Sequence, residues 1–284
     1  MTVKEVEVKS ILTRTSGFLS GVSSHSLQPY RGCSFGSSLC GVGCYAQFGY
    51  GLPRGIPWGT FLEARVNAAR VYRKQYESEK AWARRAGKHF GIFMSSSTDP
   101  FVPQEERYRI TEQLLVAMVE QPPDRLIVQT HTHRVTKYMP LYQRLPPECD
   151  LRFHISIESD RDTLPGLPPP ASSVERRFEA ALALRQTGFR VVIVVSPLLP
   201  IERPEVFFER IARSADAVVI DHFILGDGTL SGWKTRKTAL PAAMAAVDPS
   251  CIFLDYRERM VAIARATMPG RVGISAPGFG GQFE

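Results

Sequence analysis

Three of the five cysteines in this chain lie close together between Gln28 and Gly51, in a stretch rich in glycine and aromatic residues. Six residues separate Cys33 from Cys40 and three separate Cys40 from Cys44, so all three sulfur atoms can reach one inorganic centre without a long loop. A [4Fe–4S] cluster needs four ligands. Three cysteines would therefore bind three of its irons and leave the fourth iron open to another molecule.

The same cysteines could instead hold a structural zinc ion, with a histidine as the fourth ligand. Zinc sites favour pairs of ligands separated by about two to four residues, and only Cys40 and Cys44 fit that spacing. His25 or His89 would have to fold in to complete such a site. We therefore favour the iron–sulfur cluster and keep zinc, or no metal, as the alternatives.

The residues around the outer cysteines resemble those of a known family. Tyr30-Arg31-Gly32-Cys33 and Cys44-Tyr45-Ala46 are similar to the cluster loop of radical S-adenosylmethionine (SAM) enzymes, and among these to spore photoproduct lyase-like proteins. That superfamily usually spaces its cysteines more closely, so this chain carries an altered CX6CX3C motif. The family also tends to place an aromatic residue just before the third cysteine, against the adenine of SAM, where this chain has Gly43.

The composition is that of an ordinary folded protein, with 284 residues, 44% hydrophobic and 22% charged. No apolar run approaches the length needed to cross a membrane, and the N-terminus MTVKEVEVKS lacks the apolar segment of a signal peptide. We therefore expect a cytoplasmic protein with no membrane partner. Cysteines stay reduced in that compartment, which favours metal over disulfides. The net charge of +7 allows an anionic partner such as nucleic acid.

Strand-like and helix-like segments alternate along most of the chain. A helix is predicted from about Thr60 to Ala86, and short apolar runs that read as strands start near residues 90, 126, 151, 190 and 217. Strands alternating with helices imply a parallel sheet with right-handed crossovers. With one more strand near the cysteine loop, about six βα repeats are predicted. The periodicity alone allows either a barrel or an open doubly wound sheet.

The resemblance implies the barrel. It predicts an α/β fold in which a partial (β/α)6, TIM-like barrel of the radical SAM type carries a short C-terminal extension. Residues 1–27 would form an N-terminal lead-in and residues 28–226 the core barrel. Residues 227–284 would form the extension, made of a helical segment and a glycine-rich tail.

Polar residues follow each predicted strand. Ligands of parallel α/β folds bind at the carboxyl ends of the strands, so we expect these residues and the cysteine loop to open on one face. Hydroxyls and carboxylates there suit the ammonium, carboxylate and ribose groups of a zwitterionic ligand. The candidate cofactor-binding residues are Ser95, Ser96, Ser97, Asp99, Thr130, His131, Ser156, Glu158, Ser196 and His222.

The resemblance implies roles for three of these groups. The segment from Ser95 to Phe101 resembles the family's segment that contacts the amino group of SAM. Thr130-His131-Thr132 resembles a Thr-Lys-Ser stretch, with His131 in place of the lysine. Ser156 and Glu158 lie on the strand where a serine and a polar neighbour usually hold the ribose or the methionyl carboxylate.

Two further cysteines are predicted to be structural. Cys149 directly precedes a predicted strand, so it would lie at the end of the barrel opposite the site. Cys251 follows Asp248-Pro249-Ser250, outside the repeat pattern. The cysteine that returns a hydrogen atom in enzymes like spore photoproduct lyase is therefore not visible, and Tyr45 or Tyr256 could substitute for it.

Together these features predict a lyase-like radical SAM enzyme, in which Cys33, Cys40, Cys44 and Tyr45 are the catalytic group. The resemblance implies that SAM binds the open iron and is cleaved to a 5′-deoxyadenosyl radical, which abstracts hydrogen from the substrate. It also implies an external one-electron reductant of the flavodoxin or ferredoxin type. The substrate could be nucleic acid, as in DNA-lesion repair, or else a peptide or small metabolite. A zinc-stabilised nucleic-acid-binding protein without catalysis is the alternative of a different class.

Overall fold

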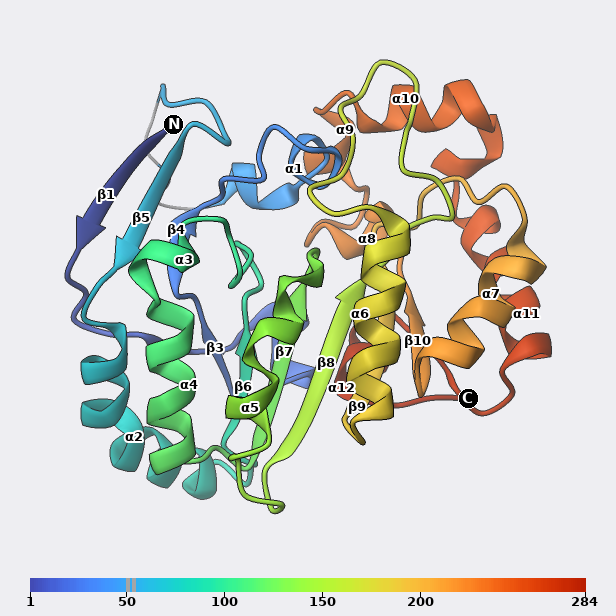
Figure 1. Ribbon diagram of the computed structural model, residues 1–284. Coiled ribbons are helices and arrows are strands. Elements are labelled where there is room, and N and C mark those ends of the chain that lie inside the picture. The colour runs from blue at the N-terminus through green and yellow to red at the C-terminus, as the bar shows by residue number, and fades with distance from the viewer. Residues whose placement is uncertain (50–51, 53–54) are drawn as a thin grey trace.

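The computed structural model describes residues 1–49, 52 and 55–284 (Figure 1). Tyr50 and Gly51, which end the stretch that bears the cysteines, lie outside the described residues. The strands, in chain order, are β1 (Thr2–Val6), β2 (Leu12–Arg14), β3 (His25–Leu27), β4 (Tyr30–Gly32), β5 (Phe61–Arg65), β6 (Gly91–Met94), β7 (Arg125–Thr130), β8 (Asp150–Ser156), β9 (Arg190–Val195), β10 (Ala217–Ile220) and β11 (Val272–Ile274).

The helices fill the connections between the strands, and short 3-10 turns are labelled η. They are η1 (Gly17–Gly21), α1 (Leu39–Val42), η2 (Tyr45–Phe48), α2 (Ala68–Arg85), α3 (Glu105–Tyr108), α4 (Ile110–Glu120), η3 (His133–Tyr138), α5 (Met139–Tyr142), α6 (Val174–Gln186), α7 (Pro204–Ser214), α8 (Phe223–Gly226), α9 (Trp233–Arg236), α10 (Leu240–Val247), η4 (Pro249–Ile252), α11 (Leu254–Thr267) and α12 (Ser275–Gly280). None of the described helices is both long enough and apolar enough to cross a membrane.

A large sheet dominates the described part of the chain, with eight strands in the order β11-β10-β9-β8-β7-β6-β3-β2. In this order, neighbouring strands from β11 to β3 pair in parallel, and β2 forms the edge antiparallel to β3. The predicted α/β class with a parallel sheet is confirmed. Within the described residues the edge strands β2 and β11 do not pair with each other, so closure into a (β/α)6 barrel stays a prediction.

The two faces of the sheet carry two separate cores, because successive side chains of a strand point to opposite faces. Phe153 belongs to the main core under the helices, where α6 packs on β8 and β9 and α7 packs on β10. Val192 and Val194 belong to a second core, called the inner core here, with Phe93 and Phe279. Phe279 comes from α12, which packs against β10, β11 and η1. Figure 1 shows α4, α5 and α6 on the near side of the sheet and α12 behind it.

Two strands correct the sequence prediction. The helix predicted from Thr60 to Ala86 begins only at Ala68, because Phe61–Arg65 forms β5, which pairs with β1 and β4. Val272–Ile274, which overlaps the start of the predicted glycine-rich tail at Gly273, forms β11 and extends the large sheet beside β10. Both strands owe their conformation to partners far away in the chain, so local residue spacing could not reveal them.

Candidate functional site

The three clustered cysteines come from one tightly folded loop between β4 and β5. Cys33 directly follows β4, Cys40 lies in α1 and Cys44 immediately precedes η2. The loop can fold back on itself because position 41 has no side chain: a Cβ at Gly41 would lie 2.2 Å from the carbonyl oxygen of Phe35. As a result, all three cysteines line one cavity.

The three thiols are close enough to influence one another. Burial raises the pKa of Cys33 to about 11 and that of Cys44 to about 12, and Cys33 raises the pKa of Cys44 further. Burial and then Cys33 also raise the pKa of Cys40, whose sulfur lies 3.3 Å from the hydroxyl of Ser38. The thiolate is the form that binds metal, so metal binding here would release these protons.

The arrangement of the cysteines fits a cluster better than it fits a single ion. Among the residues that the structure describes, no three His, Cys, Asp or Glu side chains lie close enough together to bind one metal ion. One zinc ion would need every ligand within about 2.0–2.3 Å. An iron–sulfur cluster takes its thiolates on separate irons, and three thiols lining one cavity meet that requirement.

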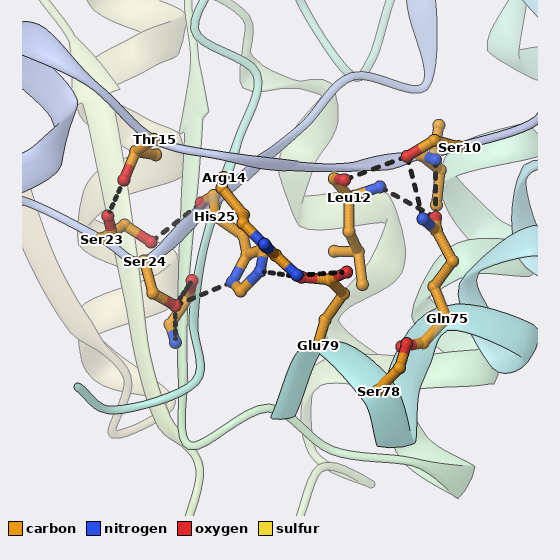
Figure 2. A network of polar contacts seen from close by, with 12 residues as sticks. Ser10, Leu12, Arg14, Thr15, Ser23, Ser24, His25, Gln75, Ser78 and Glu79 are labelled. Atoms are coloured by element: carbon orange, nitrogen blue, oxygen red, sulfur yellow. Dashed lines mark hydrogen bonds and ion pairs between the residues drawn. The ribbon is translucent and has the colours of Figure 1, made fainter. Parts of the chain in front are cut away.

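The two histidines that the zinc alternative required are placed elsewhere. Nε2 of His25 lies 3.0 Å from Glu79 Oε2, and its Nδ1 lies 2.8 Å from Ser24 Oγ (Figure 2). Arg14 donates to the same Glu79 carboxylate, at 2.9 Å. Both ring nitrogens of His25 are therefore engaged, and His89 is exposed just before β6. Neither histidine lines the cavity that the cysteines line.

That cavity has a volume of about 340 Å³, within the range of roughly 300–1,000 Å³ that is typical of small-molecule sites. Side chains from the carboxyl ends of the sheet strands surround it, as the sequence predicted. All the predicted site residues except Thr130 and Ser156 line it, namely Cys33, Cys40, Cys44, Tyr45, Ser95, Ser96, Ser97, Asp99, His131, Glu158, Ser196 and His222.

Thr130 is an exception because side chains alternate along a strand, and Ser156 is one because Gln129 covers it. The hydroxyl of Thr130 donates to the carboxylate of Asp99, at 2.9 and 3.0 Å, while its neighbours Gln129 and His131 line the cavity. Ser156 lies behind Gln129, whose Nε2 is 3.5 Å from the Ser156 hydroxyl. Both predicted residues therefore support the cavity wall from behind.

The segment after β6 is tied to the cysteine loop. The hydroxyl of Tyr45 donates to the carbonyl oxygen of Ser96, at 2.6 Å. Gln28 donates to the hydroxyl of Ser96 at 2.8 Å and accepts from the amide of Ser97 at 3.4 Å. Ser95 has a φ of 77°, and its buried hydroxyl has no partner in the described part of the chain. An unpartnered buried hydroxyl that lines a cavity is available to a ligand.

Asp99 joins two strand ends. Its carboxylate accepts hydrogen bonds from the amides of Phe101 and His131, each at 2.8 Å, and from the hydroxyl of Thr130. Burial raises the pKa of Asp99, and these hydrogen bonds oppose that rise. Because its oxygens are used within the chain, Asp99 positions the loop after β6 against the end of β7.

A buried charge network forms the wall between β7 and α6. Nδ1 of His131 lies 2.8 Å from Glu158 Oε1, and Arg177 donates to Glu158 Oε2 at 2.6 Å and to the carbonyl oxygen of Ser156 at 2.5 Å. Burial would raise the pKa of Glu158, but the Arg177 guanidinium and the His131 contact hold it at about 2. The ionised Glu158 carboxylate therefore pairs with Nδ1 of His131, while Nε2 of His131 has no hydrogen-bond partner among the described residues.

Residues at the carboxyl ends of β9 and β10 complete the wall of the cavity. Ser196 follows β9, and Asp221 follows β10 with its Oδ1 accepting from Ser275 Oγ at 2.7 Å and from the His222 amide at 3.0 Å. Burial raises the pKa of Asp221 to about 6. Oδ2 of Asp221 has no hydrogen-bond partner among the described residues, so this carboxylate can receive a ligand.

His222 lines the cavity with its ring nitrogens already used. Nε2 donates to the carbonyl oxygen of Cys251 at 2.9 Å, and Nδ1 accepts from the amide of Ile224 at 3.1 Å. These partners fix one neutral tautomer, and burial lowers the pKa of the ring. His222 therefore shapes the end of β10 instead of offering a free nitrogen.

Sequence reasoning left several cavity residues out of the predicted site. Gln129 lies two residues before His131, so a period of two along the strand could have found it, and Asp221 could have been found as the polar residue that directly follows a strand. Arg177 lies in α6, where nothing local marks it as buried. Phe279 and Leu240 come from the predicted C-terminal extension and also line the cavity. Only the tertiary fold brings them there.

The cysteines outside the loop do not line the cavity. Cys149 is buried just before β8, and Cys251 is buried in η4, where its carbonyl oxygen holds His222. Burial raises the pKa of both thiols to about 12. The hydroxyl of Tyr256 accepts from the amide of Ile201 at 2.8 Å. Of the two tyrosines considered as hydrogen donors, Tyr45 alone lines the cavity within the described residues.

No protein-family model matches this chain. Its sequence is 27% identical over 149 residues to an uncharacterized protein of Acidianus two-tailed virus, covering 51% of this chain and 44% of the relative. An uncharacterized protein of Mycobacterium tuberculosis is 23% identical over 205 residues, which cover 70% of this chain and 57% of that protein. An uncharacterized protein of Methanocaldococcus jannaschii is 22% identical over 180 residues, which cover 61% of this chain and 60% of that protein. The matches thus span about half of these relatives' own lengths.

Solved structures of spore photoproduct lyase resemble the whole chain. A mutant of that enzyme with a tyrosine replaced by phenylalanine superposes with a TM-score of 0.59 at 14% identity, over 96% of this chain and 81% of that one. A second mutant, with a cysteine replaced by alanine and with dinucleoside spore photoproduct, gives a TM-score of 0.61 at 16% identity, over 96% and 80%. The chain therefore has a spore photoproduct lyase-like fold.

Proposed function

We propose that this chain is a radical SAM enzyme in which Cys33, Cys40 and Cys44 hold a [4Fe–4S] cluster and the adjoining cavity binds SAM. One observation carries the proposal: three thiols from one loop line the same cavity as the polar residues at the ends of the parallel strands. The spore photoproduct lyase-like fold supports it. The altered cysteine spacing and the reaction itself belong to the proposal.

The cavity offers the groups that a zwitterionic, ribose-bearing ligand needs. The free Ser95 hydroxyl, the carboxylate of Asp221 and Nε2 of His131 can accept or donate at separate points of the wall. Arg177 and Glu158 hold the His131 ring in place. Tyr45 fixes the segment around Ser96 by its hydrogen bond, so that segment is preorganised next to the cysteines.

Cys33, Cys40 and Cys44 would hold the cluster, which would supply the electron for reductive cleavage of SAM and so for hydrogen abstraction from the substrate. The protein must orient the reacting groups and exclude other hydrogen donors. Phe93 and Phe279 line the cavity with apolar rings on the side of the inner core. His222, locked by two hydrogen bonds, keeps its N–H proton directed at the carbonyl oxygen of Cys251.

Nucleic acid is the substrate class that we propose first. The net charge of +7 favours a polyanion, and one neighbouring structure was solved with a dinucleoside spore photoproduct. A peptide or small metabolite is the alternative. Tyr45 is our candidate for returning hydrogen to the product, because its hydroxyl lies at the cavity and the thiols of Cys149 and Cys251 do not.

Iron and sulfide analysis tests the proposal. Protein purified and reconstituted without oxygen should contain about four irons and four sulfides per chain, and Cys33→Ala should lose most of both. Cys149→Ala is the matched control, since that thiol lies outside the cavity, and it should keep the full content. Stoichiometric zinc without iron would instead support the zinc-stabilised binding protein.

A further inference from the structure

A compact turn beside the cysteine loop exposes two large apolar side chains. Leu230 is 84% exposed and Trp233 is 42% exposed. The buried carboxylate of Asp227 holds this turn by accepting from the amides of Thr229 and Thr235, each at 2.9 Å. The two side chains are therefore held at the surface by an ordered turn, as in protein interaction sites.

The same turn is basic. Lys234, Arg236 and Lys237 lie in or next to α9, and residues 228–240 contain no Asp or Glu. Nζ of Lys237 lies 4.5 Å from the centre of the Trp233 ring. In the described part of the chain, no carboxylate pairs with any of these three cations. We call Leu230, Trp233, Lys234, Arg236 and Lys237 the α9 surface.

The α9 surface lies directly on the cysteine loop. The ring of Trp233 is 6.0 Å from that of Phe48 in η2, which begins immediately after Cys44. Leu240 packs on Gly43, the residue just before Cys44, since a Cβ at Gly43 would lie 2.3 Å from Leu240 Cδ2. Figure 1 shows α9 and α1 at the same end of the molecule. A partner bound there would contact the segment that directly follows Cys44.

We propose that the α9 surface is the docking site of an acidic one-electron carrier of the flavodoxin or ferredoxin type. This inference rests on the proposed function, because such a partner is needed only if the cysteine loop holds a redox cluster. The step transfers one electron and no atoms: the reduced flavin or iron–sulfur centre of the carrier is oxidised by one electron, and the cluster of this chain is reduced by one.

The chemistry of the surface favours such a carrier over nucleic acid. Electron-transfer partners form small, transient contacts and are guided by opposite charge. The α9 surface offers two exposed apolar side chains and three cations within eight residues of sequence. A substrate must enter the cavity, whereas none of the five residues of the α9 surface lines it. The site for the electron donor is therefore separate from the site for the substrate.

The first test compares two reductants on the reconstituted full chain with SAM. With Lys234→Glu/Lys237→Glu, 5′-deoxyadenosine formation driven by flavodoxin and its reductase should fall about tenfold at low salt. Formation driven by dithionite, which needs no docking, should change by less than about twofold. Arg84→Glu/Arg85→Glu, at the end of α2, is the charge-matched control and should leave both rates unchanged. Raising the salt should shrink the difference between variant and unaltered protein.

The second test measures binding without turnover, by titrating oxidised flavodoxin into the full chain in a calorimeter. Trp233→Ala should weaken binding about tenfold, while Phe253→Ala, which removes a ring that is 56% exposed elsewhere, should not. An equal loss with both reductants would overturn the inference, as would flavodoxin binding that is independent of Trp233 or an effect confined to oligonucleotide binding. If the unaltered protein makes no 5′-deoxyadenosine with dithionite, the proposed function fails, and this titration still decides the docking site.

Discussion

At the scale of single residues, the cavity is organised by one buried ionised carboxylate. Glu158 contacts both His131 and Arg177, and the side chain of Arg177 is only 3% exposed. A buried charge that keeps its partners is tolerated, but the same charge without a partner is costly. The pair therefore fixes this wall of the site and holds the His131 ring in position.

We predict that Glu158→Gln lowers the free energy of unfolding by about 3 kcal/mol at pH 7, because it leaves the Arg177 guanidinium buried without its counter-charge. The folded pKa of Glu158 is about 2, below the ordinary value of 4.5. Its stabilising contribution is therefore complete above about pH 4.5 and is lost as the pH falls towards 2. Urea unfolding should show the difference between variant and unaltered protein shrinking below about pH 4.

Glu175→Gln provides the matched control for that experiment. Glu175 pairs with Arg210 at 2.6 Å, but its side chain is 63% exposed, so its loss should cost less than about 0.5 kcal/mol. A difference between Glu158→Gln and the unaltered protein that stays constant from about pH 7 to about pH 3 would contradict the account of this charge pair.

At the scale of elements, the site depends on the contact between the cysteine loop and the helices after β10. Gly43 has a φ of −85° and a ψ of −1°, which any residue can adopt, so space alone requires glycine there. Leu240, in α10, occupies that space. The sequence shows a glycine at position 43, but it could not show that a leucine almost two hundred residues later packs against it.

We predict that Gly43 and Leu240 are energetically coupled. Gly43→Ala would push against Leu240 Cδ2 and cost about 1–3 kcal/mol, and Leu240→Ala would cost about 2–5 kcal/mol by leaving a cavity. The methyl group added by the first change fits the space opened by the second, so the double variant should cost less than the sum by about 1 kcal/mol. A double-mutant cycle in urea measures this, and strict additivity would refute the contact.

At the scale of the whole molecule, the sequence predicted the repeated strands and helices better than it predicted the C-terminal elements β11 and α12. Runs such as Val191–Val195 are apolar throughout because both faces of the sheet are covered there. Such strands, and the helices between them, can be predicted from the local sequence. The three-residue strand β11 and the helix α12 could not, because they are ordered by β10 and by the inner core. The predicted extension therefore contributes Leu240 and Phe279 to the cavity, which local patterns had no means to show.

We predict that the inner core holds the C-terminal segment to the sheet mainly through Phe279, which is 6% exposed. Phe279→Ala should lower the free energy of unfolding by about 3–5 kcal/mol. The exposed Phe253 offers a control, because Phe253→Ala should change stability by no more than about 0.5 kcal/mol. Equal, small effects of both substitutions in urea unfolding would show that α12 does not stabilise the inner face.

Cleavage of SAM is the decisive assay for a radical SAM site at the cysteine loop. The reconstituted chain, reduced with dithionite under strict exclusion of oxygen, should convert SAM to 5′-deoxyadenosine and methionine in equal amounts, quantified by mass spectrometry. Cys33→Ala should lose this activity and Cys149→Ala should retain it, because the first thiol lines the cavity and the second does not. A protein that holds iron and sulfide yet forms no 5′-deoxyadenosine, or one in which both variants form it equally, would contradict a radical SAM site at the cysteine loop.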